Sequence, residues 1–308
     1  MLAGKVNCES RVDKTDLPID LEVASRVINN DHPEARSHAC RKIALATGKR
    51  RIVMSQLSAS TVAAVVGSVL LVAANVCNSA DVPKWTYGGK TGPDKWGKLE
   101  SGFAECNLGQ FQSPIDIPDA KTRKGDFQSL LFNYKPTPLK IVDNGRTIQV
   151  IYAPGSFVSV EDNRYDLLQF HFHKPAEEKI DGKGHDMDVH LVHRGQDGKL
   201  AVIAVLLDAG KENKLLKTLM ENVPKEKGKE TTVGTVTISA VDLLPESKGY
   251  YRFPGSLTTP PCSESVTWIV LKTPAQVSAD TIARFSRLYP MNARPVQPLN
   301  GRDIQATR

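Results

Sequence analysis

The chain contains 308 residues, of which 24% are charged and 40% hydrophobic. This composition is typical of a globular protein, and the length suits one large domain or two small ones. The net charge of +6 is modest and is not gathered into one stripe of the sequence, so we expect no nucleic-acid partner.

One long apolar run, residues 57–76, carries no charge. Lys49, Arg50 and Arg51 precede it, and small residues follow it as far as Ala80. Basic residues, an apolar stretch and a small-residue exit are typical of a secretory signal, although about 20 apolar residues also suffice for an uncleaved membrane anchor. The exit favours cleavage, so we expect a leader over residues 1–80 and the mature domain over 81–308.

The 53 residues before Met54 are an unusual extension, because a signal peptide normally begins its chain. Met54 could be the true start, or the extension could be a short cytosolic tail on a signal anchor. The pair Arg50-Arg51 also permits a twin-arginine signal to a lumen. Sequencing the mature N-terminus decides between these readings: a start near Asp81 supports cleavage, whereas an intact apolar run excludes it.

The cysteines bear on the compartment. Cys8, Cys40 and Cys77 lie in the expected leader, which leaves Cys106 and Cys262 in the mature chain. An even count behind a secretory signal suggests a disulfide, and the alternative is two free buried thiols.

The mature chain is predicted to be mainly β (α+β), a single domain with few peripheral helices. We interpret the Gly-, Lys- and Trp-rich segment from Trp85 to Gln112 as surface loops. The run Leu200–Leu207 is apolar on both faces, which suits a central strand covered on both sides. Helices are expected at Lys214–Asn222 and Ala279–Leu288. Apolar and β-branched runs bounded by turn residues predict further strands at Leu139–Val142, Thr147–Tyr152, Phe157–Val160, Leu167–His173, Asp188–His193, Val233–Ile238 and Val266–Leu271.

Two histidines in one predicted strand suggest a metal site. His171 and His173 are two residues apart, so they point to the same face of the strand, with Gln169 beside them. The strand Asp188–His193 can bring His190 to the same point. Three neutral imidazoles with an open fourth position are typical of a catalytic zinc, whereas the pair alone could equally be hydrogen-bonded histidines within a sheet.

A proline-rich loop follows later in the chain. Thr258-Thr259-Pro260-Pro261 predicts a rigid extended segment, because proline fixes its own φ and restricts the residue before it. Such a loop could hold one hydroxyl over a site, or it could be an ordinary proline-rich turn.

Seven segments follow one another along the chain: Trp85-Thr-Tyr87, Gly92-Pro-Asp-Lys-Trp96, Gln112-Ser-Pro-Ile-Asp116, Gln169-Phe-His171-Phe-His173, Asp188-Val-His190-Leu-Val-His193, Gly255-Ser-Leu-Thr258-Thr259-Pro-Pro261 and Asn292-Ala-Arg294-Pro-Val-Gln-Pro-Leu299. Taken together and in this order, they resemble the α-class carbonic anhydrases over residues 85–304. The resemblance implies a single domain around a large, mostly antiparallel, twisted sheet, with zinc at the bottom of a conical cleft. It also implies reversible hydration of carbon dioxide to bicarbonate and a proton by a zinc-bound hydroxide.

The resemblance also implies roles for single residues. His171, His173 and His190 are expected to bind one zinc ion, and Thr258 to orient the hydroxide while donating a hydrogen bond to Glu177. Gln169 and Asp188 resemble acceptors that orient the first and third ligands. The expected substrate pocket is made by Val192, Val202, Leu257, Val266, Trp268 and Thr259.

Three positions depart from the family pattern. Arg146 stands where fast members carry a proton-shuttling histidine, and an arginine stays protonated and cannot shuttle. Asn144, Gln149 and Tyr87 share the cleft with it. Asp188 and Glu178 stand where the family usually has glutamate and histidine. We expect Glu178 to be solvated, His185 to be exposed in a loop and His193 to be structural, because it faces away from His190.

The resemblance further implies a disulfide between Cys106 and Cys262, which secreted members share, and inhibition by sulfonamides and anions. We expect a secreted protein or one of another oxidising compartment; the alternatives are a thylakoid lumen and a membrane anchor, should residues 57–76 stay uncleaved. The competing hypothesis on function is a catalytically silent relative that acts in binding or storage. Such relatives typically lose zinc ligands, and all three are present here.

Overall fold

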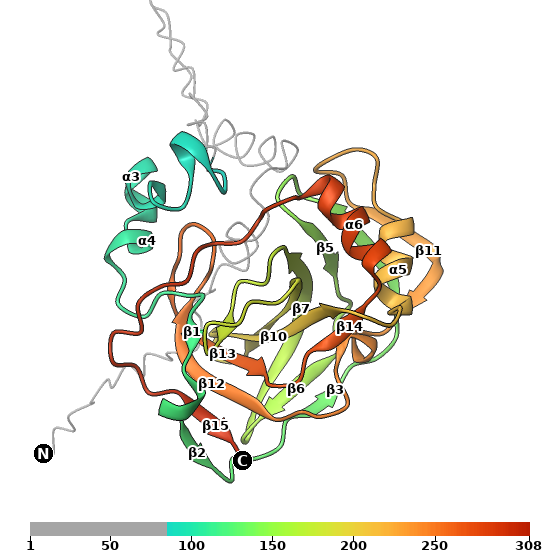
Figure 1. Ribbon diagram of the computed structural model, residues 1–308. Helices are drawn as coiled ribbons and strands as arrows, with labels where there is room; N and C mark the ends of the chain where they lie inside the picture. Colours follow the sequence, from blue (N-terminus) through green and yellow to red (C-terminus); the bar gives the residue numbers. More distant parts are fainter. Residues whose placement is uncertain (1–84) are drawn as a thin grey trace, which may run out of the picture.

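One large twisted β-sheet dominates the structure (Figure 1). The structure is a computed structural model in which residues 85–308 are described, so the expected leader, with its apolar run 57–76, lies outside the described residues. The sheet is mixed and mostly antiparallel. The predicted mainly β fold class is therefore confirmed. None of the helices in residues 85–308 is long and apolar enough to cross a membrane.

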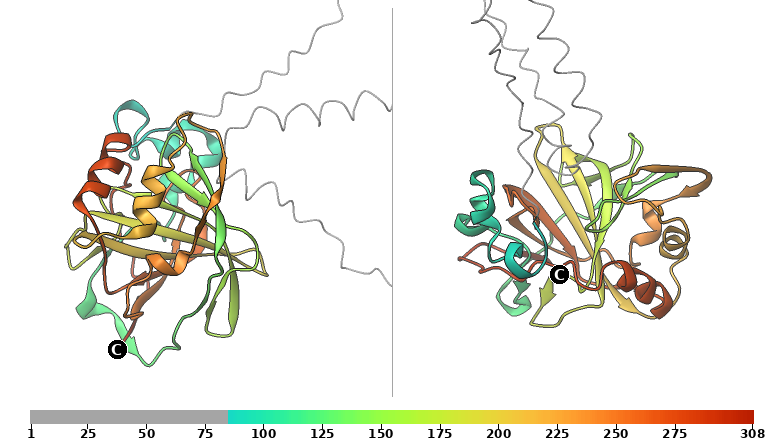
Figure 2. Two further views of the ribbon diagram at one scale, coloured as in Figure 1. Left: turned by 90° about the vertical axis from the view of Figure 1, so that its right-hand side faces the viewer. Right: turned by 90° about the horizontal axis from the view of Figure 1, so that it is seen from above.

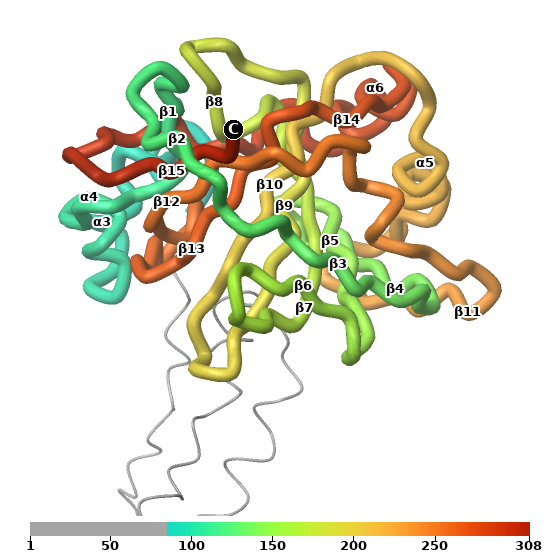
Figure 3. The backbone as a smooth tube through the Cα atoms, turned by 90° about the horizontal axis from the view of Figure 1, so that it is seen from below, coloured from blue at the N-terminus to red at the C-terminus, as the bar shows by residue number. Residues whose placement is uncertain are grey.

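The main sheet contains thirteen strands. In chain order they are β2 (Arg123–Gly125), β3 (Leu131–Asn133), β4 (Thr137–Asp143), β5 (Ile148–Ile151), β6 (Phe157–Val160), β7 (Asn163–His173), β9 (Met187–Gly195), β10 (Leu200–Ala209), β11 (Thr231–Ile238), β12 (Tyr250–Ser256), β13 (Glu264–Leu271), β14 (Ala275–Val277) and β15 (Gln305–Thr307). Ten of them follow one another across the sheet in the order β11-β4-β5-β7-β9-β10-β13-β12-β15-β2, which Figure 3 shows from below. The other three pair beside this path, β14 with β10, β6 with β7, and β3 with β6. A separate pair joins β1 (Asp116–Ile117) to β8 (Lys179–Ile180).

The strand predictions are confirmed, with ends that differ by up to four residues. β10 lies between β9 and β13, and Ala201 to Leu207 are all buried, as expected of a strand covered on both sides. Both predicted helices are present as α5 (Lys214–Glu221) and α6 (Ala279–Leu288). The sequence interpretation missed β12 and the short strands at the margins of the sheet.

Alternation along the strands divides the sheet into two faces. Phe170 and Phe172 of β7 belong to one buried cluster, which also includes Phe285 of α6. Val202 and Trp268 belong to a second cluster on the opposite face. Figure 2 shows α5 and α6 on one side of the sheet and the N-terminal helical turns on the other. His171 and His173 alternate with the two phenylalanines, so they face away from the cluster that contains α6.

The expectation that Trp85 to Gln112 forms surface loops is right about its exposure, because most of its residues are exposed or half-buried, and wrong about its conformation. The segment folds into short helical turns, and Trp96 is fully buried, with its indole N–H donating to the carbonyl oxygens of Thr86 and Thr91. Trp96 packs in a small buried cluster with Phe103, Cys106 and Cys262, so this segment has an apolar core of its own. The short helices are η2 (Gly89–Thr91), α3 (Trp96–Leu99), η3 (Ser101–Phe103) and α4 (Glu105–Leu108), and elsewhere η4 (Asp119–Lys121) and η5 (Ala240–Leu243).

Cys106 and Cys262 form a disulfide across 156 residues of sequence. It joins α4 to the loop that carries Thr258, and both cysteines are buried. The guanidinium of Arg294 adds a second link to the same segment, because Nη2 donates to the carbonyl oxygen of Cys106 and Nη1 to that of Ser113.

Removing this disulfide by the pair Cys106→Ala and Cys262→Ala should lower the free energy of unfolding by about 2–5 kcal/mol, because a cross-link over a long stretch of chain restricts the unfolded state most. Chemical denaturation of the variant and its parent measures the difference. A thiol assay on the folded parent should find neither cysteine reactive, and two titratable thiols there would contradict the bond.

Candidate metal centre

Strands β7 and β9 bring three imidazoles together. The two strands pair antiparallel, with His171 directly opposite His190, and His173 lies two residues along β7 on the same face. The ring centroids of His173 and His190 are 4.6 Å apart, and those of His171 and His173 are 5.1 Å apart. One ring nitrogen from each of the three lies within 4.8 Å of the others. The sheet register therefore gathers the three histidines that the sequence had singled out.

The second nitrogen of two rings already has a hydrogen-bond partner. Nδ1 of His171 lies 2.9 Å from Oε1 of Gln169, and Nδ1 of His173 lies 2.8 Å from the carbonyl oxygen of Asn292. A carbonyl oxygen only accepts, so Nδ1 of His173 carries the proton and Nε2 keeps its lone pair. Nε2 of His173 is buried and has no hydrogen-bond partner within residues 85–308. The sequence interpretation gave Asn292 no role, although its motif was noted.

The third imidazole is oriented the other way round. Nε2 of His190 is hydrogen-bonded to Oε2 of Glu178 at 3.2 Å, and Oδ2 of Asp188 lies 3.4 Å from the same nitrogen. Oδ2 of Asp188 also accepts the backbone N–H of Glu177 at 2.6 Å. Nδ1 of His190 is left facing the other two rings. The expectation that Glu178 is solvated is wrong, because its side chain is 0% exposed and contacts a candidate ligand.

Glu177 lies behind the histidines in the same buried layer. Its Oε1 accepts the backbone N–H of Arg294 at 2.7 Å and lies 3.5 Å from Nδ1 of His173. Its Oε2 has no hydrogen-bond partner among the described residues. The expected hydrogen bond from the hydroxyl of Thr258 to Glu177 is therefore not seen among residues 85–308, and the role of Thr258 in orienting the hydroxide stays a prediction.

The protonation of the rings follows from their surroundings. Burial and the neighbouring imidazoles lower the pKa of His171 well below its usual value, and burial lowers the pKa of His173 to about 4. Both rings are neutral at physiological pH, the form in which imidazole binds metal ions. Burial disfavours a charge on His190, but Asp188 and Glu178 outweigh it and raise the pKa of that ring well above its usual value.

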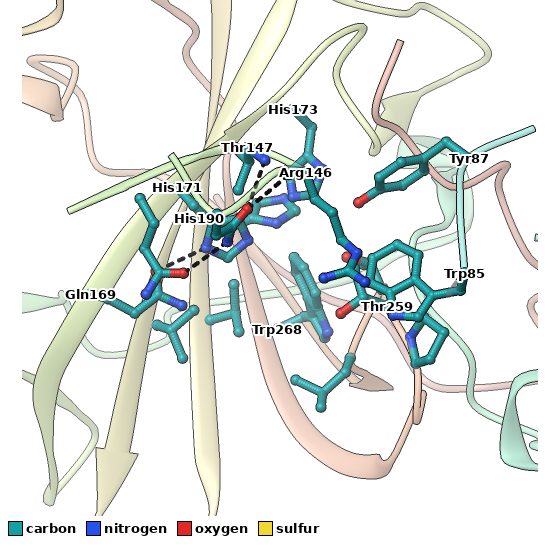
Figure 4. A pocket seen from close by; sticks show the side chains of 17 residues that line it. Trp85, Tyr87, Arg146, Thr147, Gln169, His171, His173, His190, Thr259 and Trp268 are labelled. Atoms are coloured by element: carbon teal, nitrogen blue, oxygen red, sulfur yellow. Dashed lines mark hydrogen bonds between the residues drawn. The ribbon is translucent and has the colours of Figure 1, made fainter. Parts of the chain in front are cut away.

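A pocket opens onto the three imidazoles (Figure 4). One wall is apolar, with Val192, Val202, Leu257 and Trp268, and the Trp268 ring meets His190 edge-on at 4.9 Å between centroids. Thr258 and Thr259 line the pocket from the proline-rich loop. Val266 does not line it and is instead buried in the cluster behind the wall.

The mouth of the pocket is polar and aromatic. The guanidinium carbon of Arg146 lies 4.2 Å from the ring centroid of Trp85, and Tyr87 lies beside that ring. Nδ2 of Asn144 donates to Oε1 of Gln149 at 3.4 Å, and Oδ1 of Asn144 accepts the backbone N–H of Arg146. Trp85, Thr147 and Pro260 also line the pocket. The sequence interpretation had assigned these three no part in it.

The two other histidines of residues 85–308 serve other contacts. His193 is buried on the opposite face of β9, where Nε2 lies 2.8 Å from the hydroxyl of Tyr134, in line with a structural role. His185 was expected to be exposed, and this is wrong: it is buried, and Nδ1 lies 2.8 Å from Oδ1 of Asp208. Neither side chain lines the pocket.

The donor set fits zinc. Imidazole nitrogens are borderline ligands that Zn²⁺ accepts in a tetrahedral arrangement, and three of them leave one position for water or substrate. In this site each ring has its far nitrogen next to a hydrogen-bonding oxygen, the arrangement that fixes the tautomer and orientation of zinc-binding histidines. The orphaned Nε2 of His173 is the atom that a cation at this point would satisfy.

Comparison with known proteins gives the same answer as the geometry. Residues 91–308 match the family described as eukaryotic-type carbonic anhydrase. A carbonic anhydrase from Nostoc sp. is 45% identical over 226 residues, which are 72% of this chain and 86% of that protein. A hyperthermostable carbonic anhydrase from a hydrothermal vent chimney superimposes with a TM-score of 0.70 at 43% identity, over 73% of this chain and all (100%) of that one.

The α-carbonic anhydrase from Thermovibrio ammonificans, solved with the inhibitor sulfanilamide, gives a TM-score of 0.69 at 39% identity and covers 72% of this chain and 99% of that chain. The matched residues contain the three histidines, the apolar wall and the proline-rich loop. The chain therefore belongs to the eukaryotic-type, or α-class, carbonic anhydrases, and it is an enzyme of that family.

Proposed function

We propose that this enzyme catalyses the zinc-dependent, reversible hydration of carbon dioxide to bicarbonate and a proton, with His171, His173 and His190 as the zinc ligands. One observation carries the proposal: three imidazoles, of which His173 and His190 are buried and His171 is half-buried, turn one nitrogen each toward a common point while an oxygen lies against the other nitrogen of each ring. Zinc bound there supplies a Lewis acid that ionises water near neutral pH, as it does in carbonic anhydrases generally.

The other residues bind, orient and exclude water. Val192, Val202 and Trp268 give carbon dioxide, which has no net dipole, an apolar surface beside the imidazoles. Thr258 lines the same pocket, and its hydroxyl both donates and accepts, so it can orient a reacting oxygen. We propose that Glu177 takes the hydrogen bond of Thr258, which would give its orphaned Oε2 a partner.

The proton that leaves the centre must cross the mouth of the pocket. Arg146 lies at that mouth with its guanidinium against the ring of Trp85, and a guanidinium does not release its proton at any working pH. Asn144 and Gln149 are neutral amides that can order water but cannot titrate. We therefore propose that transfer to buffer, or through ordered water, limits turnover in this enzyme.

We propose that the enzyme works in an oxidising compartment, either secreted or in a lumen. The disulfide between Cys106 and Cys262 supports this, because such bonds persist where thiols are not kept reduced. The apolar run 57–76 lies outside the described residues. Sequencing the N-terminus of the mature protein would therefore show whether this run is cleaved or kept as an anchor.

The zinc assignment predicts one zinc per chain and carbon dioxide hydration that a sulfonamide inhibits. His171→Ala should lower zinc affinity and activity by more than roughly a hundredfold, because loss of even an outer-shell partner of a ligand costs about 10–100-fold. Metal analysis, stopped-flow hydration and sulfanilamide titration measure the three quantities.

His185→Gln is the matched control, since that histidine pairs with Asp208 outside the pocket and its loss should leave one zinc per chain. Zinc well below one per chain in the parent, together with no sulfonamide-sensitive hydration, would favour the catalytically silent alternative.

Arg146→His should raise turnover at low buffer concentration by roughly tenfold or more, because a positioned general base contributes about 10²–10⁴ in favourable cases. At high buffer concentration the variant and parent should converge, since buffer then carries the proton in both. Arg146→Gln is the control: it removes the charge without adding a titratable group and should leave the low-buffer rate unchanged. Equal rates for Arg146→His and the parent at low buffer would refute the proposal that proton transfer limits turnover.

A further inference from the structure

Glu178 is a buried carboxyl group to which the proposed reaction gives no part. Its side chain is 0% exposed, and the residue lies between Glu177, which faces the histidines, and Lys179 of β8. Burial of a carboxyl group is costly unless a specific contact repays it. Within residues 85–308 its carboxyl group is hydrogen-bonded to Nε2 of His190 and lies beside the carboxyl group of Asp188, so we look for its role at that ring.

The geometry at His190 favours Glu178 over Asp188 as the hydrogen-bond acceptor. Oε2 of Glu178 is 3.2 Å from Nε2 with hydrogen-bonding geometry, whereas Oδ2 of Asp188 is farther away, at 3.4 Å. Asp188 and His190 are two residues apart in β9, so their side chains lie on the same face, and both acidic groups interact with the ring.

Asp188 also has a second task. The Oδ2 atom nearest to His190 already accepts the backbone N–H of Glu177 at 2.6 Å. This bond holds the turn between β7 and β8 against β9, and it draws the acceptor toward the backbone of Glu177. A carboxylate oxygen can accept a second hydrogen bond, so the bond to Glu177 does not exclude His190, but it fixes where Oδ2 lies.

We propose that Glu178 is a positioning residue for the third zinc ligand: it accepts the Nε2 hydrogen bond of His190 and so turns Nδ1 toward the metal, while Asp188 anchors the chain at Glu177. Glu178 thus orients His190, and Asp188 holds the segment behind it. This inference rests on the proposed zinc site and adds to it which side chain holds the third ligand.

The test compares two amides at one position. Glu178→Gln keeps the length and an acceptor oxygen, whereas Glu178→Asn keeps the amide but withdraws the oxygen by one methylene. Glu178→Asn should weaken zinc binding about 10–100-fold, the usual effect of losing an outer-shell partner, and Glu178→Gln should stay within about threefold of the parent. Competition with a chelator gives the zinc dissociation constant, and the visible spectrum of the Co²⁺-loaded protein reports ligand geometry independently of activity.

A second substitution should reverse the loss. In the Glu178→Asn background, Asp188→Glu lengthens the neighbouring acceptor by one methylene, so we expect it to recover zinc affinity to within about tenfold of the parent. Glu226→Asn, in the exposed loop after α5, is the control for the substitution itself. Thermal unfolding of the zinc-free proteins checks that all variants fold; if Glu178→Asn does not, Glu178→Leu takes its place against Glu178→Gln.

If the zinc dissociation constant of Glu178→Asn lies within twofold of that of the parent, the proposed role of Glu178 is overturned. Equal losses in the Gln and Asn variants would overturn it too, because the effect would then not depend on reach. Both results leave the proposed function standing if the parent binds one zinc and hydrates carbon dioxide. A parent that binds no zinc refutes the proposed function itself.

Discussion

The register between β7 and β9 is the constraint on which the site depends. It places His171 opposite His190 and His173 opposite Asp188, and side chains alternate faces along each strand. A slip of one residue would send the imidazoles into the apolar cluster and Phe170 and Phe172 into the pocket. The buried phenylalanines therefore fix the face on which the histidines lie, and the pairing of His171 with His190 fixes their alignment along the strands.

The rest of the site comes from residues that are distant in sequence but lie against this pair of strands. Asn292 reaches His173 through its carbonyl oxygen, and the next turn of chain sends the N–H of Arg294 to Glu177. The side chain of Arg294 in turn binds the segment that ends in Cys106, and the disulfide carries that link to the loop of Thr258. One buried guanidinium thus ties the layer behind the histidines to the loop that covers them.

How far the sequence predicts this arrangement depends on the range of the interactions. Period-two alternation is local, so the strands, the ligand face and the central position of β10 were predictable. β12 was not, because Pro254 argues against a strand. In the structure β15 pairs only with Tyr251 and Arg252 of β12, which leaves that edge of the strand open at Pro254, where a sheet tolerates proline. Trp96 and Glu178 were misread for a related reason: part of what buries them comes from other segments of the chain, such as Cys262 against Trp96 and His190 against Glu178.

The electrostatics of the buried layer support a cation at the point where the imidazoles converge. Three carboxyl groups, those of Glu177, Glu178 and Asp188, are fully or almost fully buried there. Each has one oxygen without a hydrogen-bond partner in the described chain, and the nearby Nε2 of His173 is unpartnered as well. Burial raises the pKa of Glu177 and of Glu178, and the two acidic neighbours Asp188 and Glu178 raise the pKa of His190, so protons balance part of this buried charge when no metal is bound. A divalent cation bound by the rings would stabilise the ionised carboxylates in place of those protons, and the acceptors behind it would make each imidazole a stronger donor to the metal.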